Sequence, residues 1–395
     1  MEKCYDLIIV GAGPAGLSTA LHLSDFTRNP KLACPQLTSI LILEKARHPR
    51  PKLCAGGILA DGEAVLAKLG LDIREVPHID VGSALFNYEG RGLVARFFNK
   101  KPIFRTVRRS ESDAWLANKV KERGIEIREE VKVVKVEVFE NYALLQTNKG
   151  EYRAKVVVGA DGSNSRVRAS VAKSKPPHVG RTLEVIVPVY ATSQAQNSAS
   201  FEFHPIAKGI SGYLWDFPAQ IDGESKRCWG IYDSNIIKRE NRQPLRQILA
   251  KEMAKNGYDL DDYELKGHPI RWYEPRIQTT VPRIILVGDA LGVDALLGEG
   301  ISLALGYGRI AAKEILRAFK KDDFSFQGYG GRLLRSRLGG ALWRRTFIAR
   351  LFYSFKSRFW QSFIWHWIKW LPALLGAVFV IGWEKKNKTR DKNSQ

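Results

Sequence analysis

The sequence predicts a Rossmann-like α/β fold, and three observations predict it. Tyr5–Val10 is a short apolar run, residues 11–16 read GAGPAG, and a second apolar run occupies Ser39–Glu44. A buried strand, a glycine turn that opens a helix and a second buried strand form the first unit of a doubly wound parallel sheet. We expect the helix over Ala15–Leu23 and a surface loop over Asp25–Thr38, which is polar and contains two prolines.

Elements of the same fold recur far along the chain. We expect a helix over Ser110–Arg123, with Ser110 as its N-cap and Asp113 three residues on. The other predicted elements are strands at Val131–Phe139, Ala143–Thr147, Glu151–Val158 and Arg283–Val287, and a helix at Gly298–Phe319. Residues 178–275 alternate apolar and polar side chains and are rich in aromatic residues, which is typical of an antiparallel sheet.

This order predicts a first domain that is interrupted by an insertion. We assign residues 1–82, 103–175 and 276–320 to the Rossmann-like domain. An antiparallel-sheet substrate domain is expected from 83–102 and 176–275, with Pro176 and Pro177 at one boundary, and a basic, hydrophobic helical C-terminal region from 321–395.

The charge of the chain favours an anionic partner. Lys and Arg number 62 against 41 for Asp and Glu, a net charge of +21. Positive residues gather near the end, at Arg332, Arg335, Arg337, Arg344, Arg345, Arg350, Lys356 and Arg358, and again at Lys385, Lys386, Lys388, Arg390 and Lys392. These two clusters bracket an apolar, aromatic stretch, which favours an anionic membrane surface and not nucleic acid.

The apolar stretch between the clusters, Phe347–Trp383, admits three structures. Its last part, Leu371–Trp383, is shorter than the ~20 residues that a spanning helix needs. The first possible structure is an interfacial or re-entrant anchor. The second is a true membrane span formed by Leu371–Trp383 together with Phe359–Trp370, and the third is a buried core helix. Cations on both flanks fit docking to the cytoplasmic leaflet. The four cysteines are scattered, so we expect no metal site and a reducing, cytoplasmic location of the catalytic part.

The glycine-rich turn predicts a dinucleotide site. Gly11 allows the tight turn, Gly13 lets the backbone approach a pyrophosphate, and Gly16, next to Ala15, lets the helix pack on the strand. The helix N-terminus stabilises the phosphate charge. Glu44 ends the next strand, where a carboxylate accepts hydrogen bonds from ribose hydroxyls.

Two further strands end in small residues and an aspartate. The first runs into Asp161-Gly162 and the second into Gly288-Asp289, followed by Gly298-Glu299-Gly300-Ile301 at a helix start. A carboxylate at such a strand end can meet cofactor hydroxyls. The helix N-terminus carries about half a positive charge, which would stabilise an anionic cofactor. Glu299 would partly offset that field. Its own role is either to stabilise the helix N-terminus or to take part in catalysis.

The three motifs in this order resemble the flavoprotein family of the aromatic hydroxylases and geranylgeranyl reductases, over residues 5–310. The resemblance implies FAD as the cofactor. It implies that Asp289 holds the ribityl chain and that Asp161 and Gly162 lie near the pyrophosphate. Arg109, ahead of Asp113, resembles the family's flavin-contacting arginine, although Ser112 replaces the usual aromatic residue.

Two segments resemble the geranylgeranyl reductase branch. Residues 51–57 read PKLCAGG, close to that branch's P-x-x-C-G-G-G loop, and Tyr213, Trp215 and Phe217 match its Y-x-W-x-F-P signature, although only Gly230 remains of the G-x-G that follows. The three aromatic residues alternate along a strand and so point to one side. They form either an apolar channel wall or ordinary core, and Phe201, Phe203, Trp229, Trp272 and Tyr273 add aromatic surface nearby.

Cys54 is the candidate catalytic residue. A thiol stays mostly protonated at neutral pH and burial raises its pKa further, so Cys54 could donate a proton to an alkene carbon. Water is the alternative proton source, and a plain buried hydrophobe is the alternative role.

Three functions are consistent with these residues. The first is FAD-dependent reduction of carbon–carbon double bonds in the polyprenyl chain of a lipid, quinone or pigment. The second is an FAD-dependent monooxygenase or halogenase with an apolar substrate, and the third is a lipid- or quinone-binding flavoprotein without turnover. The family resemblance implies NADPH or ferredoxin as electron donor and does not choose between them. The sequence does not indicate an oligomeric state.

Overall fold

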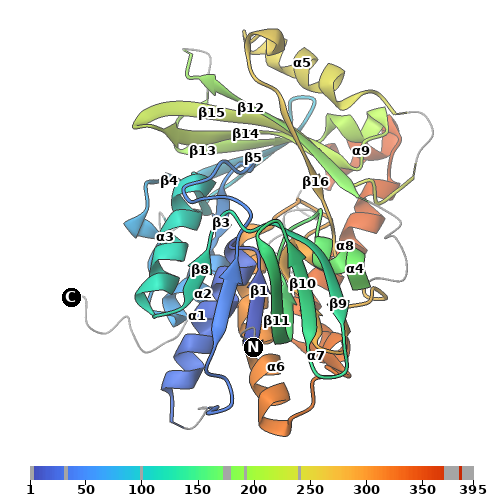
Figure 1. The fold of residues 1–395 in the computed structure, drawn as a ribbon. Coiled ribbons are helices and arrows are strands. Elements are labelled where there is room, and N and C mark those ends of the chain that lie inside the picture. Colours follow the sequence, from blue (N-terminus) through green and yellow to red (C-terminus); the bar gives the residue numbers. More distant parts are fainter. Residues whose placement is uncertain are drawn as a thin grey trace.

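The computed structural model describes residues 4–30, 34–97, 101–171, 179–190, 194–238, 242–368 and 382–384. Within these ranges the strands form two large sheets and one small one. Figure 1 shows the two large sheets one above the other, with α5 on the far side of the upper sheet.

The lower sheet is the Rossmann-like part. Its described strands run in the order β17-β18-β11-β1-β2-β8, and β9 and β10 extend it from β11. The pairs β8–β2, β2–β1, β1–β11 and β11–β18 are parallel. The strands are β1 (Cys4–Val10), β2 (Ile40–Leu43), β8 (Glu126–Arg128), β9 (Val133–Val138), β10 (Ala143–Thr147), β11 (Gly150–Gly159), β17 (Thr280–Val281) and β18 (Ile284–Leu286). The central strands are apolar because both faces of the sheet are covered.

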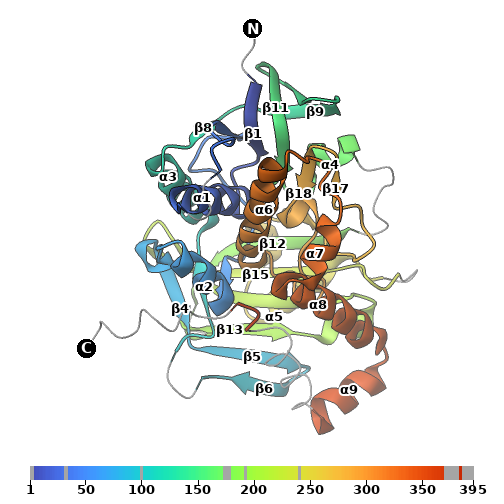
Figure 2. The ribbon, with the colours of Figure 1, turned by 90° about the horizontal axis from the view of Figure 1, so that it is seen from below.

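Helices from opposite ends of the sequence cover this sheet together. α1 (Pro14–Arg28) packs along α6 (Ile301–Lys321), as Figure 2 shows, and α3 (Arg109–Glu122) lies beside α1. The Ser18 hydroxyl donates a 2.7 Å hydrogen bond to the Leu305 carbonyl. A side chain at Gly308 would collide with Ser18, because its Cβ would lie 2.4 Å from the Ser18 Oγ. The close approach of α1 and α6 therefore depends on a glycine in α6.

The upper sheet is assembled from two separated parts of the sequence. Its described strands run in the order β16-β12-β15-β14-β13-β5-β6. They are β5 (Ser83–Tyr88), β6 (Arg91–Ala95), β12 (Gly180–Pro188), β13 (Ser198–Glu202), β14 (Gly212–Ile221), β15 (Glu224–Asp233) and β16 (Lys266–Ile270). One face packs on α5 (Leu245–Lys255), and the other carries an aromatic cluster that faces the rest of the molecule. The small sheet consists of β3 (Gly57–Leu59), β7 (Phe104–Val107) and β4 (His78–Val81). Its strands β4 and β7 contact β14 of the upper sheet, and α2 (Ala60–Lys68) packs on α6 of the lower part.

Three helices follow α6: α7 (Tyr329–Arg335), α8 (Arg337–Ser354) and α9 (Arg358–Trp367). α8 is fixed to the loop before α6 by buried polar contacts. The Arg345 guanidinium is 0% exposed and lies 3.3 Å from Asp294 and 3.0 Å from Glu299. The Tyr353 hydroxyl donates to the Leu296 carbonyl at 2.5 Å. This side of α8 is therefore part of the core.

Most predicted elements are found, and three predictions are wrong in detail. α1 continues to Arg28, so the predicted loop from Asp25 begins inside a helix. Ser110 is not an N-cap: α3 begins at Arg109 with Arg108 as its N-cap, so Ser110 already lies in the first turn. The helix predicted over Gly298–Phe319 is α6, which begins at Ile301 with Gly300 as its N-cap.

The prediction that places Arg345 in a surface basic cluster is also wrong, because buried carboxylates surround it. Arg332 is half-buried and pairs with Glu314. β5 pairs with β13, so residues 83–95 and 180–270 share a sheet. The division into three domains stays a prediction, and Pro176 and Pro177 lie outside the described residues.

The predicted anchor at Leu371–Trp383 lies almost wholly outside the described residues. In the part of the chain that the structure describes, no helix combines the length and the apolar character that crossing a membrane requires.

We expect Arg345→Met to destabilise the fold strongly, because it leaves Asp294 and Glu299 buried without a cation. Breaking a buried ion pair from one side costs about 3–5 kcal/mol. Urea unfolding of the variant measures this, with Arg337→Met, an exposed position on the same helix, as control. A loss no larger than that of Arg337→Met would show that the pair does not hold α8 in place.

Candidate flavin and substrate cavity

One large cavity lies where the two large sheets meet. Its volume is about 2080 Å³, and its walls come from the carboxyl ends of β1 and β11, the aromatic face of the upper sheet, α8 and α9. Sites for drug-sized ligands usually have ~300–1,000 Å³. The cavity is therefore large enough for a dinucleotide together with a long apolar ligand.

The cavity brings together most of the site residues predicted from the sequence. They are Gly11, Gly13, Ala15, Glu44, Cys54, Arg109, Asp161, Gly162, Tyr213, Trp215, Phe217, Asp289, Gly298, Gly300 and Ile301. Gly16 and Gly288 do not line it and serve packing: a Cβ on Gly16 would lie 2.1 Å from the Gly11 carbonyl oxygen, and one on Gly288 2.7 Å from the Ala15 Cβ.

The glycine turn is held open toward the cavity. Gly11 has φ of +105°, and a Cβ there would lie 2.4 Å from the Ala160 carbonyl oxygen. The Glu44 carboxylate accepts 2.8 Å and 3.1 Å hydrogen bonds from the backbone amides of Ala12 and Ala46. Glu44 thus fixes the turn from the end of β2, and it faces the cavity as well.

Arg50 is a cavity residue that the sequence did not single out. Its Nη2 donates to the Ala12 carbonyl at 3.3 Å, and it lies 3.5 Å from Glu44 and 3.3 Å from Asp113. A Cβ built on Gly13 would lie 3.8 Å from Arg50 Nη2. The cation is therefore next to the glycine that lets a pyrophosphate approach. An arginine in a loop carries no local motif, so only the tertiary contact reveals it.

Arg109 and Asp113 form a bidentate pair on α3, with two hydrogen bonds of 2.9 Å. Both side chains are buried, and the Asp113 carboxylate also faces Arg50. The nearby carboxylate holds the pKa of Arg109 above its usual value despite burial. Arg109 is thus a permanently charged group in the wall beside Cys54.

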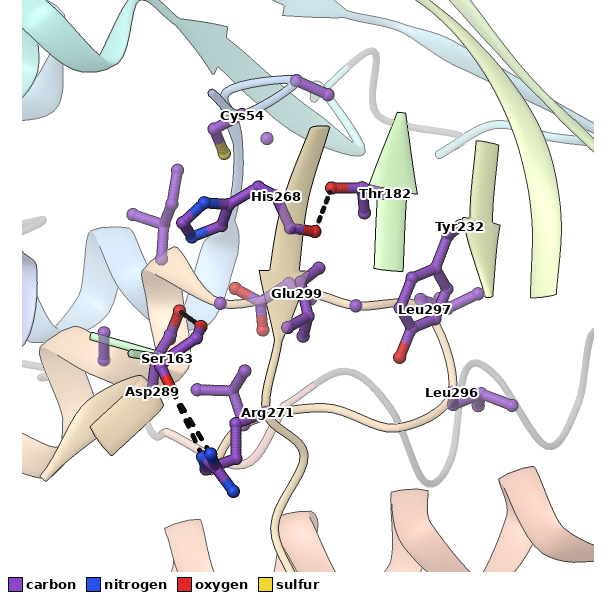
Figure 3. Close-up of a pocket in the computed structure, with 18 of the residues that line it drawn as sticks. Cys54, Ser163, Thr182, Tyr232, His268, Arg271, Asp289, Leu296, Leu297 and Glu299 are labelled. Atoms are coloured by element: carbon purple, nitrogen blue, oxygen red, sulfur yellow. Dashed lines mark hydrogen bonds between the residues drawn. The ribbon is translucent and has the colours of Figure 1, made fainter. Parts of the chain in front are cut away.

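The two strand-end aspartates lie in one region of the cavity. Asp161 accepts hydrogen bonds from the backbone amides of Arg166 and Val167 and so caps α4 (Arg166–Val171). Asp289 accepts a 3.2 Å hydrogen bond from the Ser163 hydroxyl, and Arg271 donates to the Ser163 carbonyl at 3.4 Å. Figure 3 shows Ser163, Asp289 and Arg271 together on one side of this region, opposite Cys54.

The helix start after Gly298 faces the same region. Gly298, Gly300 and Ile301 line the cavity at the N-terminus of α6. Glu299 accepts a 2.7 Å hydrogen bond from the Ser302 amide and pairs with Arg345. The prediction that Glu299 stabilises the helix N-terminus is confirmed.

Four cavity-lining residues have buried polar atoms without a hydrogen-bond partner among the described residues: Arg50 Nε, Asp161 Oδ1, Arg271 Nη1 and, on α8, Arg344 Nε. Buried donors and acceptors are normally satisfied. The donors of Arg50 and Arg271 and the acceptor of Asp161 match the phosphates and hydroxyls of a dinucleotide. The residues present therefore fit FAD.

Around Cys54 the cavity is lined by titratable groups. Burial raises the pKa of the Cys54 thiol, and it lowers the pKa of Lys52 to about 8. Lys52 Nζ lies 2.5 Å from His268 Nε2, and burial lowers the pKa of His268 to about 4. A neutral imidazole thus accepts from Lys52. Neither Lys52 nor His268 was predicted from the sequence.

The aromatic side chains of β14 face the cavity together. Tyr213 donates to the Leu297 carbonyl at 2.6 Å, Trp215 donates to Cys228 Sγ at 3.4 Å, and Phe217 packs on other rings. Gly230 leaves room for the indole, because a Cβ there would lie 2.1 Å from Trp215. Tyr232 occupies the position at which the related signature has a second glycine, and its side chain takes up space in the cavity at this wall.

Phe201 and Phe203 also line the cavity, whereas Trp229, Trp272 and Tyr273 do not. Trp229 points to the opposite face of the sheet, against the α5 side, because side chains alternate along β15. The expectation that all five add to the wall is therefore wrong for these three.

Comparisons with known proteins agree with this geometry. A model of the FAD binding domain family matches residues 4–291, so the chain belongs to that family and is an FAD-dependent oxidoreductase. It is 27% identical to the digeranylgeranylglycerophospholipid reductase of Methanocaldococcus jannaschii, over 82% of this chain and 80% of that protein. The chain is thus geranylgeranyl reductase-like within the family. An uncharacterised protein of Methanosarcina barkeri is 28% identical over 89% of this chain and 84% of its own length.

Solved structures share the fold. A geranylgeranyl bacteriochlorophyll reductase-like protein from Thermoplasma acidophilum has a TM-score of 0.73 at 21% identity, covering 91% of this chain and 89% of that one. A variant of the halogenase PltM, solved with FAD, has a TM-score of 0.70 at 17% identity, covering 96% and 82%. These likenesses show the fold shared by reductases and halogenases.

We expect Arg50→Met to weaken FAD binding about tenfold or more, because the loss of one charge-assisted contact costs ~1.5–3 kcal/mol. Fluorescence titration of flavin-free protein with FAD measures the dissociation constant. Arg47→Met, an exposed change in the same loop, is the control. An unchanged constant in Arg50→Met would place the pyrophosphate elsewhere.

Proposed function

We propose that the protein reduces carbon–carbon double bonds in a polyprenyl chain of a lipid, quinone or pigment. The observation that carries this proposal is the continuity of the cavity. The glycine turn, Cys54 and the aromatic wall of the upper sheet all line one space. A long apolar ligand can therefore reach from the aromatic wall to the reacting groups.

The cofactor end of the cavity is formed by the glycine turn, Arg50 and the two strand-end aspartates. Gly11, Gly13 and Arg50 would hold the pyrophosphate, Glu44 the ribose, and Asp289 the ribityl chain. Asp161 and the N-terminus of α6 would complete the site, and Arg109 would face the flavin. FAD, when bound, supplies the hydride chemistry that the reduction of an alkene needs.

The substrate end is apolar and aromatic. Tyr213, Trp215 and Phe217 would bind the polyprenyl chain, together with Phe201 and Phe203. Since the polar tips of Tyr213 and Trp215 are occupied by hydrogen bonds within the protein, they present only apolar ring surface to a ligand. Binding there excludes water from the reacting carbons.

Cys54 would donate the proton. Its raised pKa keeps hydrogen on Sγ at neutral pH, so the thiol is an acid and not a nucleophile. Gly56 donates its backbone amide to Sγ at 3.4 Å, which orients the side chain in the cavity wall.

We expect FAD-loaded protein, reduced with dithionite, to add two hydrogens per double bond to geranylgeranyl lipids, measured by mass. Cys54→Ala is expected to lower the rate about 10²-fold or more, as removal of a general acid does. Cys34→Ala, which lies outside the cavity lining, should keep the wild-type rate. Full activity of Cys54→Ala would make water the proton source.

Other outcomes of this assay separate the remaining functions. Oxygen consumption with a hydroxylated or halogenated product would identify a monooxygenase or halogenase. A bound prenyl lipid that stays unreduced, whatever its headgroup, would indicate a binding protein without turnover. Replacing dithionite by NADPH or by reduced ferredoxin tests the two electron donors.

We also propose that the protein works at an anionic membrane surface on the cytoplasmic side. Where the cavity reaches the surface, its rim carries exposed apolar side chains of α8 and α9, such as Phe347 at 55% exposure. Beyond the rim, Phe359 and Trp367 are 71% and 70% exposed. Arg350 and Arg358 lie on the same two helices and are exposed, which complements anionic headgroups. A prenyl chain could then enter from the bilayer.

We expect Phe359→Ser with Trp367→Ser to weaken binding to phosphatidylglycerol vesicles about tenfold or more, because two aromatic side chains no longer enter the interface. Co-sedimentation measures binding, with Val134→Ser, an exposed apolar residue of β9, as control. The wild-type protein should bind neutral vesicles less well. Equal binding by the double variant would contradict docking through α9.

A further inference from the structure

A buried carboxyl group in the cavity wall has no role in the function proposed above. Glu184 lies on β12 and is 7% exposed. Thr182 and Glu184 line the cavity, whereas Leu183 and Val185 between and after them pack on the α5 side of the sheet. The alternation of the strand thus directs the Glu184 side chain toward the ligand space.

The partners of Glu184 connect it to the loop that carries Cys54. Its carboxyl group interacts electrostatically with the Cys54 backbone amide and with the Cys228 thiol. Cys228 Sγ in turn accepts from the Trp215 indole. In the described ranges Glu184 has no salt bridge, and Lys266 on the neighbouring strand pairs with Glu264.

The electrostatic surroundings make Glu184 an acid near neutral pH. Burial raises its pKa to about 7, although Lys266 and Lys52 oppose the rise. The pKa of Cys54 is raised mainly by burial and further by the Glu184 charge, while Arg109 and Lys52 lower it. A Cys54 thiolate is therefore the stronger base of the two, and a proton moves downhill from Glu184 to Cys54.

Resting on the proposed function, we propose that Glu184 returns the proton to Cys54 after each reduction. The Cys54 S–H bond breaks as its proton joins the substrate carbon that does not receive the hydride, and the two electrons are those of reduced FAD. The Glu184 O–H bond then breaks, the S–H bond forms again, and the Glu184 carboxylate takes a proton from water. Glu184 acts on the substrate through Cys54 and is therefore a positioning residue in this step.

The plain alternative is that Glu184 only holds the Cys54 loop to β12. Glutamine has the same shape, and its carbonyl oxygen can take the place of a carboxylate oxygen beside the Cys54 amide and the Cys228 thiol. Glu184→Gln therefore preserves the structural role and removes only the titrating proton.

The first test measures whether the charge of Glu184 affects the ionisation of Cys54, and it requires no catalytic turnover. Iodoacetamide alkylation of Cys54, followed by peptide mass spectrometry, is measured between pH 6 and 10 in flavin-free protein. We expect Glu184→Gln to be alkylated about three- to tenfold faster than wild type at pH 8, because the neighbouring negative charge is gone and the thiol ionises more readily. The control Glu202→Gln changes a carboxyl group on the same sheet that does not line the cavity. Identical profiles for wild type and Glu184→Gln would overturn the proposal.

The second test is the pH profile of prenyl reduction. In the wild type the rate should fall as the pH rises through about 7, since the required acid form of Glu184 exists below that value. Glu184→Gln should be about tenfold slower or more at pH 6 and should lack this fall, and Glu184→Asp should restore it. A wild-type rate and profile in Glu184→Gln would leave only the structural role. A wild-type protein that reduces no prenyl lipid overturns the proposed function and the proton route with it, whereas the alkylation rates still show whether the two groups titrate together.

Discussion

The register of three parallel strands is the constraint on which the rest of the structure depends. Val10 pairs with Gly159, and Gly159 pairs with Leu286, so β1, β11 and β18 end at one level. The glycine turn and the two aspartates that follow these strands are thereby brought to the same edge of the sheet. Gly11 is required there because the Ala160 carbonyl occupies the space of a Cβ. Three short segments, far apart in the sequence, thus line one region of the cavity.

The upper sheet adds the second half of the site through its side-chain alternation. One face of β12, β14 and β15 supports α5, and the other faces the cavity. Consecutive residues of a strand therefore have different environments. On β15, Cys228 contacts Glu184, whereas the next residue, Trp229, packs beneath α5. This arrangement combines an apolar wall with a few buried polar groups, as ligand-binding pockets usually do.

The sequence predicts the parts of this protein that depend on local pattern. Strong apolar runs identify β1, β2, β11 and β18, and the glycine spacing identifies the turn between β1 and α1. The placement of Tyr213, Trp215 and Phe217 on one side also follows from strand period alone.

What the sequence could not supply depends on distant partners. In the sequence Arg345 is indistinguishable from the other cations of its basic cluster, and only the fold shows that the carboxylates of Asp294 and Glu299 lie next to it. Arg50 and Glu184 have no motif, because their roles arise from contacts with other segments of the chain. Trp229 and Trp272 are aromatic residues in an aromatic-rich region, yet the sheet turns the first away from the cavity and the second is packed in the core. The predicted helix ends differ from the observed ones by one to five residues, as for α1, which ends at Arg28, and α6, which begins at Ile301.

The two faces of α8 couple the surface of the molecule to its buried polar contacts. Phe347 is exposed, while Arg345, two residues earlier, pairs with Glu299, which accepts a hydrogen bond from the Ser302 amide in the first turn of α6. A rigid helix cannot shift one face without shifting the other. Detergent or lipid that displaces the outer face of α8 is therefore expected to strain the Arg345–Glu299 pair and the first turn of α6 as well.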